Sequence, residues 1–182
     1  MTRTDSQNFT TLLDTIAQRR NASDGTVSAE SSTHIPEVKA ANVPQEVKDA
    51  VQPAETGMLE QLGHTGAAAY TYAQRVLAGD ISREQFENLI SQLMDSAQTQ
   101  FHQLQDSTVA KLKSLGNQHP DWQQAILSVF QAVSDLLIEV LNKEFGFLTT
   151  LMTDTPQQAG QVNGFFSGLV RYLEDGWSQI VG

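Results

Sequence analysis

Hydrophobic side chains recur every three or four positions from about Gly57 to the end of the chain, a spacing that is typical of amphipathic helices. One such stripe consists of Phe86, Ile90, Leu93, Ala97, Phe101, Leu104, Thr108, Leu112 and Leu115. A second consists of Trp122, Ile126, Val129, Phe130, Val133, Leu137, Val140, Leu141, Leu148 and Leu151. Further apolar positions widen the second stripe, and a helix that is apolar over more than half of its circumference is usually central in a bundle.

These stripes predict an all-α fold, namely an elongated helical bundle over residues 57–182. We expect three long helices and one or two shorter ones. The two stripes form a hairpin whose arms are each on the order of 50 Å long, at 1.5 Å per residue. Arms of that length exceed the diameter of a compact domain of this size, so the sequence predicts a rod-like molecule.

Local signals mark where the first of these long helices begins. Gly79 is expected to end the preceding helical segment, because glycine readily adopts the left-handed conformation that follows many helices. Ser82 can then cap the next helix, with Gln85 three residues later reaching back to it. Ile81 and Phe86 occupy the two positions of a hydrophobic staple. The sequence therefore predicts a helix that begins at Ser82.

The later helix ends have weaker signals. Gly116 is expected to stop the first long helix, and Pro120 occupies an early position of the second. For the last helix we expect Thr155 to be the cap and Gln158 to complete a capping box. Its apolar face consists of Ala159, Val162, Phe166, Leu169, Leu173, Trp177 and Ile180.

Residues 1–56 have a different composition and are expected to form a flexible, mostly disordered N-terminal arm. One short amphipathic helix is predicted at about residues 9–20, where the apolar positions are Phe9, Leu12, Leu13 and Ile16. From Asn21 to about Thr56 the chain is rich in Ser, Thr, Ala, Glu and Pro, which is typical of a linker with few groups to bury. Only one or two helical turns are expected at 44–52.

The charge and the amino-acid composition exclude several classes of partner. The net charge is -10 and the isoelectric point is near 4.6. Nucleic-acid affinity comes largely from Lys and Arg, so no nucleic-acid partner is expected. An anionic membrane would also repel the chain. The chain has no cysteine, which excludes disulfides and thiolate metal sites. The first twenty residues lack a signal peptide, so we expect a cytoplasmic protein or one exported without a cleaved signal.

No signature of catalysis is found in the sequence. There is no phosphate-binding loop of the Walker type and no nucleophile elbow. Glu60 with His64, and His102 with Asp106, could each offer two metal ligands. Solvated or hydrogen-bonded histidines are the simpler interpretation, because the sequence has neither the Glu-x-x-His repeat of di-iron bundles nor an HExxH motif. We therefore expect no catalytic residue, no cofactor and no metal, and a protein that is not an enzyme.

Three glycines form the most specific candidate site. Gly160, Gly164 and Gly168 share one edge of the last helix, nearly opposite its apolar face. Glycine costs about 1 kcal/mol against alanine inside a helix, so the three forfeit roughly 3 kcal/mol. One interpretation is a smooth edge, ending at Arg171, on which another helix packs closely. The other is a helix that is frayed or bent at this point, or glycines that are merely tolerated.

The first choice of function is a non-enzymatic interaction protein that self-associates or binds a partner helix through this edge. A membrane-active protein, such as a pore-forming protein or an exported effector, is an alternative. Its membrane contacts would be Phe165, Phe166, Tyr172 and Trp177. The acidic residues beside them disfavour a membrane partner. A carrier with an apolar ligand inside the bundle is a third possibility.

Overall fold

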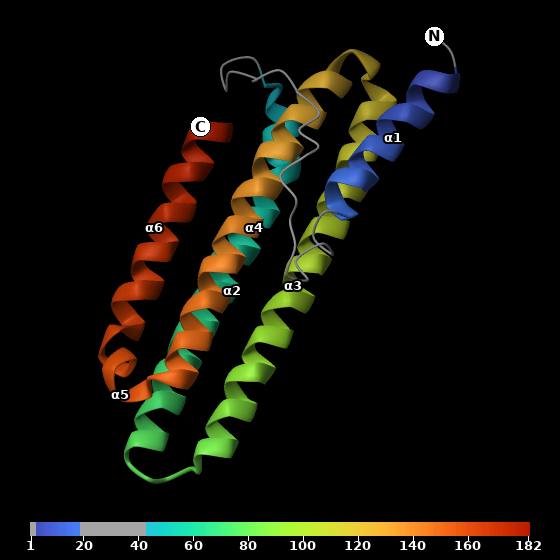
Figure 1. The fold of residues 1–182 in the computed structure, drawn as a ribbon. Helices are drawn as coiled ribbons and strands as arrows, with labels where there is room; N and C mark the ends of the chain where they lie inside the picture. The colour runs from blue at the N-terminus through green and yellow to red at the C-terminus, as the bar shows by residue number, and fades with distance from the viewer. Residues whose placement is uncertain (1–2, 19–42) are drawn as a thin grey trace. The chain divides into compact units, whose positions relative to one another are not determined.

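The computed structural model describes residues 3–18 and 43–182, with side chains described from Asn8 onward. Every regular element in these ranges is a helix, which confirms the predicted all-α helical bundle (Figure 1). The elements are α1 (Arg3–Gln18), α2 (Gln45–Leu77), α3 (Arg83–Gln118), η3 (Pro120–Trp122), α4 (Gln123–Thr153), α5 (Thr155–Gln158), η4 (Ala159–Gln161) and α6 (Val162–Val181). The three longest, α2, α3 and α4, have 33, 36 and 31 residues.

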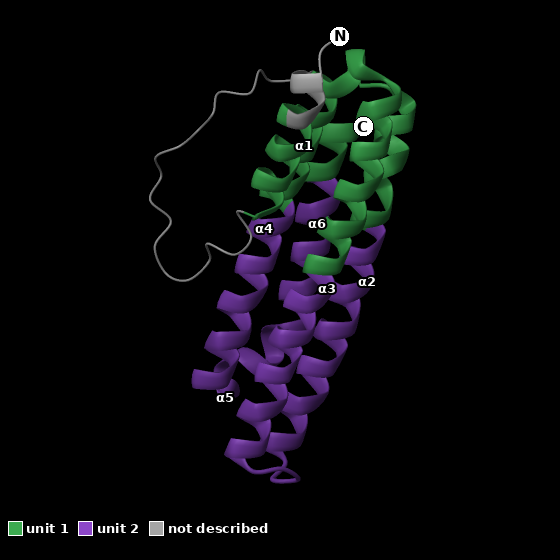
Figure 2. Ribbon diagram, turned by 90° about the vertical axis from the view of Figure 1, so that its right-hand side faces the viewer, with its two compact units in different colours: residues 1–55, 102–136, 176–182 green, residues 56–101, 137–175 purple. Residues whose placement is uncertain are grey.

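The chain divides into two compact units, and helices α2, α3, α4 and α6 each contribute a segment to both (Figure 2). Unit 1 consists of residues 1–55, 102–136 and 176–182. Unit 2 consists of residues 56–101 and 137–175. Both units bury the apolar stripes that the sequence predicts. In unit 1 the fully buried side chains include Leu13, Val47, Val51, Leu112 and Ile126, and in unit 2 they include Met58, Leu62, Phe86, Ile90, Leu148 and Leu151.

The connection between α2 and α3 is held by two capping motifs. Gly79 has a φ of 80°. The amide of Asp80 donates to the carbonyl of Arg75 at 2.9 Å, and the amide of Gly79 donates to the carbonyl of Val76 at 3.2 Å. This pair of bonds is a Schellman motif. The amide of Gln85 then donates to Ser82 Oγ at 3.1 Å, and the amide of Ser82 donates to the Gln85 side chain at 2.9 Å. Both the predicted helix end and the predicted capping box are therefore confirmed.

Helix α2 is longer than the sequence indicates. One or two helical turns were expected at 44–52, within a linker that ends near Thr56, but the helix starts at Gln45 and continues without a break through Pro53 to Leu77. Proline removes one helical hydrogen bond, but it does not end this helix. Val47 and Val51 are fully buried in unit 1, and burial of apolar side chains offsets the lost bond. The rest of the expected linker and its disorder fall on residues 19–42, outside the described residues.

The start of the last helix also differs from its prediction. The residue before α5 is Asp154, and no side chain caps this helix. Thr155 instead lies in the first helical position, where its hydroxyl donates to the carbonyl of Leu151 at 2.7 Å. The predicted capping box at Thr155 and Gln158 is therefore wrong. A 3-10 turn, η4, interrupts the helix at Gly160 before α6 begins.

In unit 1, helix α1 packs on α3 through a glycine. A Cβ on Gly116 would overlap the ring of Phe9, which is buried, so the ring uses the space that the missing side chain leaves. Lys113 Nζ also lies 2.7 Å from Asp14 Oδ1. Gly116 was expected to end α3, but the helix continues to Gln118. Its role is to admit a neighbouring side chain.

We therefore predict that Gly116→Ala loosens α1. The added methyl group displaces the Phe9 ring, which we expect to lower the free energy of unfolding by about 1–3 kcal/mol. Amide hydrogen exchange of α1 should accelerate in the variant. Gly146→Ala is the control, because a Cβ at Gly146 on α4 meets no atom within 4 Å. That control should gain about 1 kcal/mol from helix propensity, and an equal gain at Gly116 would contradict the packing role.

Candidate groove and glycine edge of unit 2

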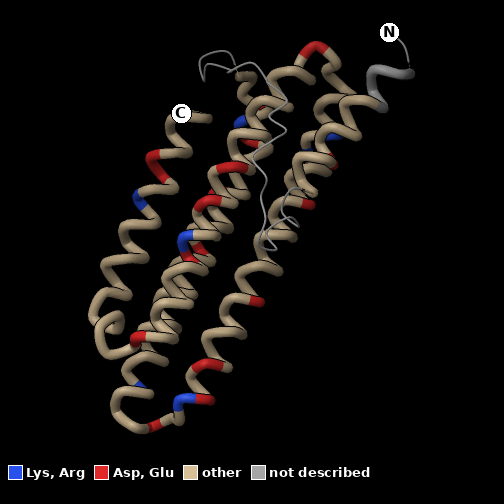
Figure 3. Tube along the Cα trace, viewed as in Figure 1, with Lys and Arg blue, Asp and Glu red and all other residues tan. Residues whose placement is uncertain are grey.

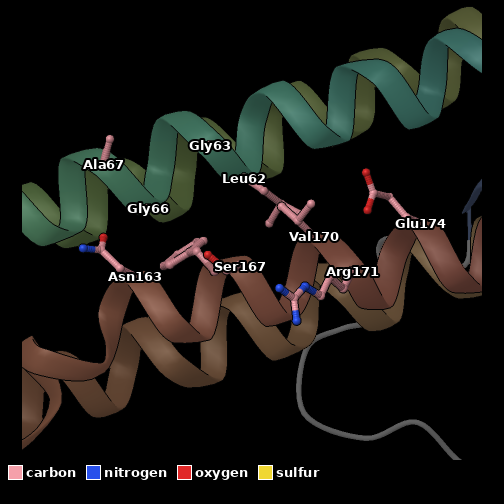
Figure 4. A pocket seen from close by; sticks show the side chains of 10 residues that line it. Leu62, Gly63, Gly66, Ala67, Asn163, Ser167, Val170, Arg171 and Glu174 are labelled. Atoms are coloured by element: carbon pink, nitrogen blue, oxygen red, sulfur yellow. The ribbon is translucent and has the colours of Figure 1, made fainter.

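An open groove lies between the unit 2 segments of α2 and α6 (Figure 4). Its volume is about 540 Å³. It is lined by Leu62, Gly63, Gly66, Ala67, Asn163, Phe166, Ser167, Val170, Arg171 and Glu174. Sequence reasoning placed only Arg171 at an interface and did not identify the α2 side. The signal available there was the spacing of Gly63 and Ala67, two small residues four positions apart.

The groove has an apolar floor and a polar rim. Leu62 and Phe166 are buried and Val170 is half-buried. Asn163, Ser167, Arg171 and Glu174 are exposed. In Figure 4 Val170 points toward α2, whereas Arg171 points away from it. An apolar strip with charged margins of this kind is suited to an amphipathic helix, whose own polar face stays in water.

The contact that sets the spacing of α2 and α6 in unit 2 is Phe166 against Gly66. A Cβ on Gly66 would lie 2.8 Å from Phe166 Cγ, closer than side-chain atoms normally approach. At Gly63, one turn earlier on α2, a Cβ would meet no atom within 4 Å. Gly66 is therefore required for packing, while Gly63 leaves open space beside the groove.

The predicted glycine edge of α6 is bare. Gly160, Gly164 and Gly168 are all exposed, and a Cβ at any of them would meet no atom within 4 Å. Among the described residues, then, nothing packs closely on this edge. Gly160 lies in η4, so the helix is locally distorted there, in line with the second interpretation of the glycines. Gly164 and Gly168 belong to the regular helix α6, and each directly follows a residue that lines the groove, Asn163 and Ser167.

The aromatic residues considered as membrane contacts do not share one exposed surface. Phe166 in unit 2 and Trp177 in unit 1 are 6% and 4% exposed. Phe165 is half-buried and stacks on Phe147 with 4.1 Å between the ring centroids. Only Tyr172 is exposed, at 39%. These positions mainly supply packing in the conformation described.

Tyr172 takes part in a polar contact between α6 and α4. Lys143 Nζ lies 5.1 Å from the centre of its ring and 3.6 Å from Glu139 Oε1. A hydrogen bond to Glu139 raises the pKa of Tyr172, because the bond is made by the protonated phenol. The three side chains form an exposed network of the kind that contributes little to stability.

A buried polar cluster joins α2 to α4 in unit 2. Glu144 is 0% exposed, and Gln61 Nε2 donates to Glu144 Oε1 at 2.8 Å and to Thr65 Oγ1 at 3.0 Å. Burial raises the pKa of Glu144 to about 7, although hydrogen bonding by Gln61 and Thr65 lowers it. The sequence did not reveal this cluster, because one Glu on an apolar helix is ordinarily assigned to the solvated face.

The histidine and carboxylate pairs do not gather into a larger set. Glu60 and His64 are both exposed on α2. Within residues 3–18 and 43–182 no group of three or more His, Asp or Glu side chains is arranged to hold a metal ion. Of the described part of the chain, one segment, Pro120–Thr153, is long and apolar enough to cross a membrane, and 61% of its most apolar window is buried inside the protein.

We predict opposite effects for alanine at the two α2 glycines. Gly63→Ala should raise the free energy of unfolding by about 1 kcal/mol, since the position is open and alanine favours helix. Gly66→Ala should lower it by roughly 1–3 kcal/mol, because Phe166 must move. Urea denaturation followed by circular dichroism measures both. Equal stabilisation by the two variants would show that Phe166 is not seated on Gly66.

Comparison of the chain with protein-family models, with curated protein sequences and with solved structures finds no match.

Proposed function

We propose that the chain is a non-enzymatic interaction protein that self-associates through the edge of α6 formed by Gly164, Gly168, Arg171 and Asp175 in unit 2. The observation that carries the proposal is the bare glycine edge. The apolar face of α6 is already buried, yet the edge nearly opposite has open Cβ positions and lies beside an open groove. Two glycines that forfeit about 2 kcal/mol of helix propensity are explained if another helix backbone approaches there.

The positions of this edge fall within a narrow arc of the helix. At 100° per residue, Gly164, Gly168, Arg171 and Asp175 lie within about 60° of one another. Arg171 and Asp175 are both exposed. Figure 3 shows a basic position on α6 followed by acidic ones. An exposed cation and an exposed carboxylate on one edge can each pair with the opposite charge on a partner surface.

A second copy of this chain supplies that surface. Arg171 and Asp175 are equally distant in sequence from Leu173. When two copies of α6 pair in antiparallel orientation with a two-fold axis at Leu173, each Arg171 faces the Asp175 of the other copy. Such isologous pairing also brings the same side of each copy together, so the two grooves become neighbours. The edge is therefore complementary to itself in charge.

Self-association can be tested by sedimentation equilibrium over a range of concentrations. The wild-type chain should form dimers. Arg171→Asp should weaken dimerisation at least tenfold, which corresponds to about 1.4 kcal/mol, because each former ion pair becomes a repulsive pair. Exchange of the two charges, in the double variant Arg171→Asp with Asp175→Arg, should restore the dimer.

Gly168→Leu tests the close approach of the two helices, and Gly146→Leu is its control. Both positions have an open Cβ site in unit 2, but only Gly168 lies on the edge. Gly168→Leu should abolish the dimer, while Gly146→Leu should leave it intact. A wild-type chain that remains monomeric at every concentration would exclude self-association, and a dimer that ignores all the α6 variants would exclude this edge.

Membrane insertion is a second candidate, supported by the length and hydropathy of Pro120–Thr153. The core helix of a water-soluble bundle meets the same criteria, and most of the apolar window is buried. If insertion is the function, the protein should release dye from lipid vesicles more readily at acidic than at neutral pH, because protonated carboxyl groups are cheaper to insert. Intact vesicles at both pH values would exclude it.

A further inference from the structure

The cluster of Gln61, Thr65 and Glu144 is an unusual feature of unit 2, because a carboxyl group is buried without a cation. The amide of Gln61 reaches only one carboxyl oxygen. The other, Glu144 Oε2, has no hydrogen-bond partner, and neither does Gln61 Oε1. Burying two acceptors without donors costs free energy of folding. A proton on the carboxyl oxygen Oε2 lowers this cost, because it turns one of the two acceptors into a donor.

No other ionisable side chain of unit 2 is buried with Glu144. The other ionisable side chains of this unit are all exposed or half-buried. They come from α2 and the turn after it, from α3 and α4, and from the segment that runs from Asp154 through α6: Glu60, His64, Tyr70, Tyr72, Arg75, Asp80, Arg83, Glu84, Glu87, Asp95, Glu139, Lys143, Asp154, Arg171, Tyr172, Glu174 and Asp175. Lys143, the preceding residue in the chain, is paired with Glu139. No described residue forms an ion pair with Glu144, so its charge, when present, is compensated only by hydrogen bonds.

We propose that Glu144 is a pH-sensing residue of unit 2: the proton on its carboxyl group keeps the α2 and α4 segments of this unit packed, and loss of that proton loosens them. A proton on Oε2 gives the cluster the donor that it lacks. Without the proton, the buried carboxylate is stabilised only by the polar side chains of Gln61 and Thr65, and opening of the unit to water relieves the cost.

The direction of the effect follows from the pKa of Glu144. Its pKa is about 7 in the folded protein and 4.5 in the unfolded chain. Between these values the unfolded chain releases the proton while the folded unit retains it, so stability falls as the pH rises from 4.5 to 7. Below pH 4.5 the contribution is fully present, and above pH 7 it is lost. The structure of unit 2 should therefore be tightest in mildly acidic solution.

The groove and the cluster share helix α2. Gln61 and Thr65 contribute to the cluster, while Leu62 and Gly66 of the same α2 turns line the groove. A change in the packing of α2 therefore reaches the surface of unit 2. The proton acts on unit 2 whether or not the chain self-associates, because the cluster is internal to the unit.

The first experiment is amide hydrogen exchange of the full chain between pH 5 and pH 8, expressed as protection factors. Global opening of unit 2 should become roughly 10- to 100-fold more frequent over this range, as two pKa values of 4.5 and about 7 require. Glu144→Gln preserves the shape of the side chain and removes its titration, so protection of α2 and α4 amides in unit 2 should become nearly independent of pH. Glu144→Met serves as a second variant if the amide fails to fit.

Glu60→Gln is the matched control, because Glu60 is the exposed acidic neighbour of Gln61 on α2. This variant should keep the pH dependence of the wild-type chain. The second experiment is a carbon-13 NMR titration of the Glu144 carboxyl group, which should show a midpoint near 7. A midpoint near 4.5, or identical pH dependence in wild type and Glu144→Gln, would overturn the proposal without bearing on self-association.

Discussion

The contact of the Phe166 ring with Gly66 determines which parts of α2 and α6 are exposed at the surface of unit 2. It fixes how closely α6 approaches α2, and it fixes which side of α6 turns inward. On a helix, Phe166 is about 200° from Gly164, so a buried Phe166 directs the glycine edge away from α2. The groove, its polar rim and the bare edge are therefore consequences of one aromatic ring placed over a missing side chain.

Glycines recur in the structure as places where a neighbour is admitted. Gly66 admits Phe166 in unit 2, while Gly116 admits Phe9 and Gly176 admits Leu136 in unit 1. Each lies inside a helix, where glycine lowers local stability, and each allows a large apolar side chain to be buried in return. Gly164 and Gly168 share the helical setting but lack the neighbour, which is why a partner outside the chain is the natural explanation for them.

Short-range features of this fold could be predicted because their causes are short-range. The Schellman motif at Gly79 and the capping box at Ser82 depend on residues within one turn, and the stripes of α3 and α4 depend only on helical spacing. The continuation of α2 through Pro53 could not be found in this way, although one or two helical turns were expected at 44–52. Pro53 and polar neighbours indicate a linker, and only the burial of Val47 and Val51 in unit 1 makes helix the better state.

One part of the candidate site, the glycine edge, could be predicted for the same reason, whereas the groove and Glu144 could not. The glycine edge of α6 is a property of one helix, so spacing alone located it. The groove requires α2 and α6 together, and sequence spacing does not say that Gly66 and Phe166 meet. Glu144 was missed because its neighbours along α4 include both polar and apolar residues. Only the packing of α2 against Glu144 reveals that the carboxyl group is enclosed.

The 3-10 turn η4 has a consequence for how the last helix is joined to the bundle. Residues three apart lie in line in a 3-10 turn, whereas they are offset in an α-helix. Ala159, the first residue of this turn, and Val162, the residue after it, are three apart and both buried. A 3-10 turn advances about 120° per residue, whereas an α-helix advances about 100°. The turn therefore rotates the buried face of the chain between α5 and α6, so that the inward face of α6 does not continue a stripe at α-helical spacing from α5.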